Sequence, residues 1–131
     1  MMKKVTRKSP VVNGLRDISM GEYWQNPLLL AEALREKLNG SPVDVKEYPQ
    51  LAKEIQVIQE LLFALAARRY GAISLLATVD IFQAVDYFLV LDDFTPDSRK
   101  GGYDDDAEVV HRAVVKHESE IRAFEAWLRV Q

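Results

Sequence analysis

The chain has 131 residues, of which 48% are hydrophobic and 9% aromatic, a composition typical of one folded globular domain with a single core. Its net charge of -3 and isoelectric point near 5.4 argue against a general nucleic-acid binder, which carries an excess of basic residues. The lack of cysteine excludes disulfides, thiolate metal sites and cysteine nucleophiles, and it is consistent with a reducing compartment.

The first 25 residues show no clear hydrophobic period. We therefore expect an irregular N-terminal arm over residues 1–25, packed on the body or mobile around it, and a single helical domain over residues 26–131. A basic cluster in the arm is followed by Ser9-Pro10 rather than by an apolar run, which argues against a secretory signal and favours a cytoplasmic protein. We interpret this cluster as a solvated segment rather than a lipid or nucleic-acid contact; it consists of Lys3, Lys4, Arg7 and Lys8.

Two helices are predicted in the first half of the chain, and each begins at a proline. Asn26-Pro27 reads as an N-cap followed by proline at the first helical position, and the pattern ends at Asn39-Gly40. The second helix is predicted from Tyr48-Pro49 to Arg69-Tyr70, where Gly71 ends or bends it. Its inward face is marked by Leu51, Ile55, Ile58, Leu62 and Leu65, and its solvent face by Lys53, Glu54, Gln56 and Glu60.

A third helix is predicted from Ile73 to Leu91, and it is almost entirely apolar. Its length approaches that of a membrane span, but Asp80 and Asp86 lie within it, and two carboxylates in a lone span are costly. A helix buried by its neighbours explains the pattern better. We expect the two aspartates to pair across helices with basic residues drawn from Arg68, Arg69, Arg112 and Lys116.

The last helix is predicted from about Asp105 to Val130. Its apolar positions alternate in steps of three and four, which is typical of a heptad-like seam; they are Ala107, Val110, Val114, His117, Ile121, Phe124 and Leu128. No segment alternates with a period of two. The sequence therefore predicts an all-α fold, a small bundle of four principal helices with short connections.

Six aspartates crowd a connector over residues 92–106, between the third and last predicted helices. Like charges at this density destabilise a fold unless helix N-termini, arginines or a bound cation balance them. The spaced residues of this connector and its flanks resemble the YkvA-like family, small bacterial proteins of unknown function. The residues that carry the resemblance are Tyr87-Phe88-Leu89, Asp93, Pro96-Asp97, Gly102 and Asp105-Asp106-Ala107, and the likeness covers about residues 65–128.

The resemblance implies a fold pattern rather than a mechanism: an apolar helix that ends in Asp-x-x-Pro-Asp, a turn with glycine, and Asp-Asp at the start of the next helix. Family members have mostly apolar residues around Pro-Asp, which suggests a location near membranes. Here the corresponding residues are polar, which argues against a membrane role for this chain; they are Thr95, Ser98, Arg99, Lys100 and Asp104.

Two interpretations of the aspartate cluster remain open. In the structural one, Asp104 or Asp105 caps the last helix, Pro96 fixes the turn, and Gly101-Gly102 reverse the backbone. In the functional one, carboxylates from both sides of the turn bind Mg²⁺ or Ca²⁺, both of which favour oxygen ligands. The candidate metal ligands are Asp93, Asp97, Asp105 and Asp106.

The two histidines carry no recognisable catalytic motif. His111 is predicted to be a surface residue paired with Glu108, and a general base or metal ligand in the alternative. His117 falls on the apolar seam, so it is predicted to be a core-edge residue or a pH-sensitive contact.

These features favour a non-enzymatic, cytoplasmic interaction or regulatory module that binds a protein partner or self-associates, without nucleic acid and without a cofactor. No catalytic residue is assigned. One alternative is a divalent-cation-binding protein or metal-dependent enzyme that uses the aspartate cluster with His111. The other is a peripheral membrane protein that uses the basic arm and residues 73–91.

Overall fold

The computed structural model describes residues 26–89 and 104–131. Every regular element in these two ranges is an α-helix, so the predicted all-α class is confirmed. The predicted N-terminal arm and most of the aspartate-rich connector lie outside the described residues. The described helices are five rather than the predicted four: α2 (Pro27–Gly40), α3 (Pro49–Ala66), α4 (Leu75–Leu89), α5 (Asp104–Lys116) and α6 (Glu118–Arg129).

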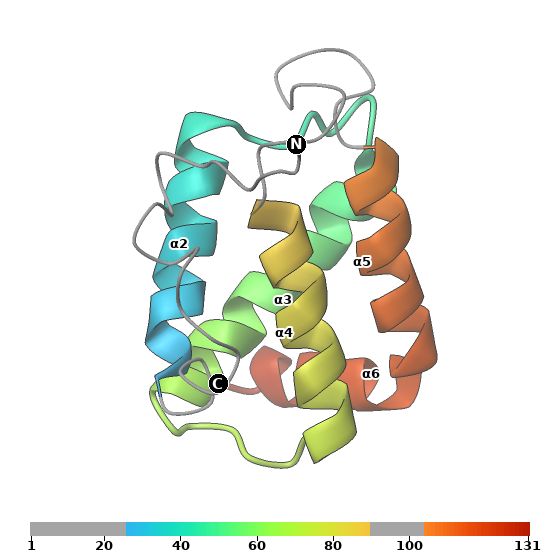
Figure 1. The fold of residues 1–131 in the computed structure, drawn as a ribbon. Helices are drawn as coiled ribbons and strands as arrows, with labels where there is room; N and C mark the ends of the chain where they lie inside the picture. Colours follow the sequence, from blue (N-terminus) through green and yellow to red (C-terminus); the bar gives the residue numbers. More distant parts are fainter. Residues whose placement is uncertain (1–25, 90–103) are drawn as a thin grey trace.

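Four of these helices lie side by side and alternate in direction (Figure 1). α2 and α4 run one way, and α3 and α5 run the other, with α3 crossing diagonally behind α4. α6 runs across the end of this group at which α3 finishes and α4 begins. The core therefore lies between α2, α3, α4 and α5 and is closed at one end by α6.

The core is built from the apolar faces that the helical spacing predicts. Its fully buried members include residues of every described helix: Leu30, Leu34, Ile58, Leu61, Leu62, Val85, Phe88, Val110 and Phe124. At about 25 cal/mol per Å² of apolar surface removed from water, each such large side chain contributes roughly 1.5–3 kcal/mol. The predicted third helix is buried along most of its length, as expected for a central helix.

The helix starts agree with the prediction, since Pro27 and Pro49 both occupy the first helical turn. Asn26 stands at the N-cap of α2, but its side chain makes no capping hydrogen bond. The missing N–H of proline is tolerated here because the first four N–H groups of a helix have no partner within the helix. Proline therefore sets these starts without a side-chain cap.

α3 ends at Ala66, earlier than the predicted end at Arg69-Tyr70. Two backbone hydrogen bonds close the C-terminal end of α3. The N–H of Arg69 donates to the carbonyl of Ala64 (2.9 Å), and the N–H of Arg68 donates to the carbonyl of Leu65 (3.1 Å). Arg68 has a φ of 58°, which lies in the left-handed region of the backbone. This is the Schellman arrangement, which normally places glycine at the left-handed position. Gly71 therefore does not end the helix.

The predicted last helix is divided at His117, which is the N-cap of α6. The apolar seam continues across the break, so Val110, Ile121 and Phe124 all reach the core. Past the break, Phe124 contacts Tyr70 edge-on at 5.0 Å between ring centroids. This contact ties α6 to the segment that follows α3.

Candidate functional site

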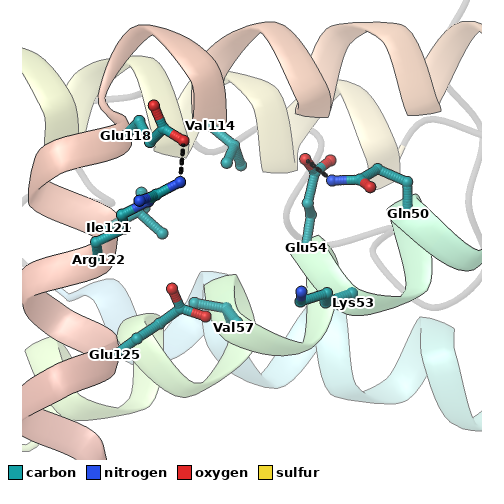
Figure 2. Close-up of a pocket in the computed structure, with 9 residues that line it drawn as sticks. All are labelled: Gln50, Lys53, Glu54, Val57, Val114, Glu118, Ile121, Arg122 and Glu125. Carbon is teal, nitrogen blue, oxygen red and sulfur yellow. Dashed lines mark hydrogen bonds and ion pairs between the residues drawn. The ribbon is translucent and has the colours of Figure 1, made fainter.

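A pocket of about 180 Å³ lies between α3 and α6, beside α5 (Figure 2). Its apolar lining consists of Val57, Val114 and Ile121, one from each of the three helices. The remaining lining is polar or charged: Gln50, Lys53, Glu54, Glu118, Arg122 and Glu125. The pocket therefore combines a small apolar surface with a charged surround.

The charged side chains around the pocket differ in how they are paired. Glu118 and Arg122 form an ion pair one helical turn apart on α6, with 2.7 Å between Oε2 and the guanidinium nitrogen. Lys53 on α3 and Glu125 on α6 point toward one another across the opening in Figure 2. One donor and one acceptor thus stand on opposite sides of the pocket.

Glu54 is the buried carboxylate of this site, with only 6% of its surface exposed. The prediction that it lies on the solvent face of its helix is wrong, because α5 packs over this position. Its Oε2 accepts hydrogen bonds from Gln50 Nε2 (2.8 Å) and pairs with His111 Nδ1 (2.7 Å). Its Oε1 is also buried and has no hydrogen-bond partner among the described residues. A buried carboxylate is costly unless it is paired, so the contact with His111 stabilises it.

His111 does not pair with Glu108, contrary to the prediction. Glu108 instead accepts from Arg112, one turn along α5, at 2.6 Å. The side chain of His111 is 51% exposed while its partner Glu54 is buried, so the ring spans from the interior to solvent. The pair could not be predicted from local sequence patterns, because His111 and Glu54 are 57 positions apart in the chain.

A second polar cluster joins α4 to the junction of α5 and α6. Asp80 Oδ2 lies 2.7 Å from His117 Nε2 and 3.0 Å from Lys116 Nζ, which confirms the predicted pairing of Asp80 with a basic residue on another helix. The hydrogen bond from His117, and then that from Lys116, lower the pKa of Asp80 from its ordinary value. His117 is 7% exposed, which confirms its predicted place at the edge of the core.

Glu120 of α6 caps the start of α4 in the same cluster. Its carboxylate accepts from the N–H of Ser74 (2.6 Å) and from the Ser74 hydroxyl (2.7 Å), and these bonds lower the pKa of Glu120. The Ser74 hydroxyl oxygen in turn accepts from the N–H of Ala77 (3.1 Å). In an ordinary capping box the acidic residue comes from the same helix. Here it comes from α6, so this cluster is explained by its structural role.

A more open depression lies between α4 and α5. It is lined by Asp80, Gln83, Ala84, Tyr87, Val109, Arg112, Ala113 and Lys116. Its charged walls already have partners, because Lys116 pairs with Asp80 and Arg112 with Glu108. In the pocket between α3 and α6, Lys53 and Glu125 face the opening as a donor and an acceptor, so this pocket is the stronger candidate site.

Two of the four predicted metal ligands lie in the described residues, and they face different surroundings. Asp105 is exposed, whereas Asp106 is completely buried. Asp93 and Asp97 lie outside the described residues. Within residues 26–89 and 104–131, no group of three or more His, Cys, Asp or Glu side chains is arranged to hold a metal ion. The metal site at the connector stays a prediction.

The predicted structural residues of the connector have a similar outcome. Pro96 and Gly102 lie outside the described residues, and Asp104 is the first residue of α5. The start of this helix therefore coincides with the aspartate run, where negative charge is favourable against the helix dipole. The capping role of Asp104 stays a prediction.

Comparison of the chain with protein-family models, curated proteins and solved structures found no match. The resemblance to the YkvA-like family stays a prediction. In the parts of the chain that are described, no helix combines the length and the apolar character needed to span a membrane.

Proposed function

We propose that this chain is a non-enzymatic helical interaction module that binds a peptide segment of a partner protein in the pocket between α3 and α6. The observation that supports this function is the contrast between the apolar residues Val57, Val114 and Ile121 and the charged residues around them. Protein interfaces combine an apolar centre with a polar rim in the same way.

The volume of the pocket fits one anchoring side chain. An apolar cavity of about 150 Å³ binds benzene, and this pocket measures about 180 Å³. A single leucine-sized or phenylalanine-sized group therefore fits against Val57, Val114 and Ile121. Interfaces commonly concentrate their binding energy in a few such buried anchors.

The rim supports a peptide rather than a simple hydrocarbon as the occupant. Lys53 donates hydrogen bonds and Glu125 accepts them, and they face one another across the opening (Figure 2). A peptide backbone presents a carbonyl acceptor and an N–H donor on either side of each side chain. The anchor in the pocket and the backbone on the rim would thus be bound together.

The remaining parts of the proposal come from the sequence. A cytoplasmic location is supported by the lack of cysteine. Membership of the YkvA-like family is supported by the spaced motif of the connector. Neither is required for peptide binding in the pocket.

A peptide-display selection against the immobilised protein tests the proposal. We expect the selected peptides to share one apolar anchor and to lose at least tenfold in affinity when the pocket is filled by Val114→Phe. Val115→Phe is the matched control, since Val115 is adjacent but 55% exposed and does not line the pocket. Thermal melts establish that both variants fold, and Val57→Phe replaces Val114→Phe if that variant does not. Peptides that bind the filled and unfilled proteins equally would show that the pocket is not the binding site.

A further inference from the structure

His111 contacts a buried carboxylate through one ring nitrogen, and its side chain is half exposed. Its Nδ1 lies 2.7 Å from Oε2 of Glu54. Gln50 holds the same Glu54 oxygen from the neighbouring turn of α3, at 2.8 Å. The carboxylate is therefore fixed in place by the helix that carries it, and the histidine is oriented by the carboxylate.

This contact selects the tautomer of the ring. An ionised carboxylate only accepts hydrogen bonds, so Nδ1 carries the proton that is shared with Glu54. In the neutral ring the lone pair then resides on Nε2. A carboxylate in this position also stabilises positive charge that develops on the imidazole when Nε2 forms a bond.

We infer that His111 is a site of covalent modification, at which Nε2 accepts a phosphoryl group from a donor with a good leaving group, while Glu54 acts as its positioning residue. Phosphoryl transfer suits this arrangement because it requires positioning and charge stabilisation and little further covalent chemistry. Acyl transfer depends more on donors that stabilise an oxyanion. This inference does not rest on the proposed peptide binding, although Glu54 also lines that pocket.

The transfer balances with phosphoramidate as the donor. Phosphoramidate reacts in its zwitterionic form, in which the nitrogen is already an ammonium group. The Nε2 lone pair forms the new N–P bond, the P–N bond breaks, and its electron pair leaves on neutral ammonia. The proton on Nδ1 stays in place, so the product is a phosphoimidazolium whose positive charge lies against the Glu54 carboxylate.

The other histidine of the chain provides an internal comparison. His117 also contacts a carboxylate, but it does so through Nε2, which lies 2.7 Å from Asp80 Oδ2. Its side chain is only 7% exposed. In His117, Nε2 is therefore the nitrogen held by the carboxylate, whereas in His111 it is Nδ1, on a side chain that is half exposed.

The test is reaction of the folded protein with phosphoramidate, followed by peptide mass spectrometry under alkaline conditions and by ³¹P NMR. We expect phosphate on Nε2 of His111 and none on His117, with both histidines reacting alike in the urea-unfolded chain. Glu54→Gln should slow labelling of His111 at least tenfold, by analogy with metal-bound histidines, for which loss of the orienting partner typically costs about 10–100-fold in metal affinity or activity. Asp80→Asn, which removes the partner of His117 instead, should leave labelling of His111 unchanged.

Three outcomes would overturn the inference. These are equal labelling of both histidines in the folded protein, phosphate on Nδ1 of His111, or a Glu54→Gln rate equal to wild type. Circular dichroism establishes that the variant is folded. If Glu54→Gln does not fold, Glu54→Asp replaces it, because its shorter side chain withdraws the carboxylate from Nδ1 and should slow labelling by the same mechanism.

Discussion

His117 Nε2 lies 2.7 Å from Oδ2 of Asp80, so the residue that separates α5 from α6 is held by the middle of α4. Glu120, one turn further along α6, holds Ser74 at the start of the same α4. The junction between α5 and α6 is therefore fixed to α4 by two contacts, one from His117 and one from Glu120. The direction of α6 is set by side chains from elsewhere in the chain.

Acid should weaken this junction. The pKa values of Asp80 and Glu120 are lowered in the folded protein from their ordinary values of 3.8 and 4.5. Because the folded values lie below the unfolded ones, the stabilisation is fully present above the unfolded values and is lost as the pH falls through the folded ones. We expect the free energy of unfolding, measured by urea denaturation, to fall as the pH is lowered below about 4.5.

Asp80→Asn should flatten this pH dependence while lowering stability at neutral pH. Glu60→Gln is the matched control, because Glu60 is an exposed carboxylate within α3 and away from the start of the helix. If the two variants showed the same pH profile, the Asp80 contacts would not be the source of the effect.

The cap of α4 should behave as a coupled pair. Ser74→Ala removes the hydroxyl that accepts from Ala77, and loss of an N-cap side chain costs about 1 kcal/mol. Glu120→Ala removes the acceptor of the Ser74 N–H and hydroxyl. The double variant should lose less than the sum of the two single losses, by about 0.5 kcal/mol or more. Additive losses in chemical denaturation would contradict the coupling.

Lys37 should be a stabilising residue despite its charge. It is 2% exposed, its Nζ donates to the carbonyl of Phe88 near the end of α4, and it lies 4.4 Å from the centre of the Phe88 ring. Lys37→Met keeps the chain length but leaves that buried carbonyl without this donor, which costs about 1–3 kcal/mol. Lys53→Met, at an exposed position, should change stability by less than about 0.5 kcal/mol. Equal effects in thermal melts would argue against the proposed role of Lys37.

The end of α3 places an arginine where glycine is favoured. Arg68→Gly should stabilise the protein by about 0.5–1 kcal/mol, because relief of the left-handed backbone outweighs the entropy cost of glycine. Gly71→Ala should be tolerated, since a Cβ there would meet no atom within 4 Å. Arg69→Gly is the control and should destabilise. A loss of stability in Arg68→Gly, measured by chemical denaturation, would contradict the proposed strain.

The sequence predicted those parts of the fold that depend on local chemistry. Pro27 and Pro49 mark helix starts because proline is compatible with a first turn whatever lies around it. The spacing of apolar residues identified most of the buried face of α3, since burial follows the helical period, and the burial of α4 followed from its almost entirely apolar sequence. The pairing of Asp80 was predictable because two charges on an apolar helix need partners.

The candidate site was not predictable from such signals. Glu54 follows Lys53 and precedes Gln56 by two residues, on the polar side of the helical pattern, and the packing of α5 over it makes it buried. His111 has Glu108 one turn away, yet Arg112 takes that carboxylate and leaves the ring to Glu54. No proline or glycine marks the helix break at His117 in the sequence. The break is stabilised instead by contacts with other parts of the chain, from His117 to Asp80 and from Glu120 to Ser74.

The single-residue junction also restricts how the length of this chain can vary among relatives. One residue inserted before Glu118 would rotate every later position of α6 by about 100° around the helix axis, since a turn takes 3.6 residues. Ile121 and Phe124 would leave the core, and Glu120 would leave Ser74. Natural selection should therefore keep the spacing from α5 to α6 constant and admit insertions and deletions between α2 and α3 instead.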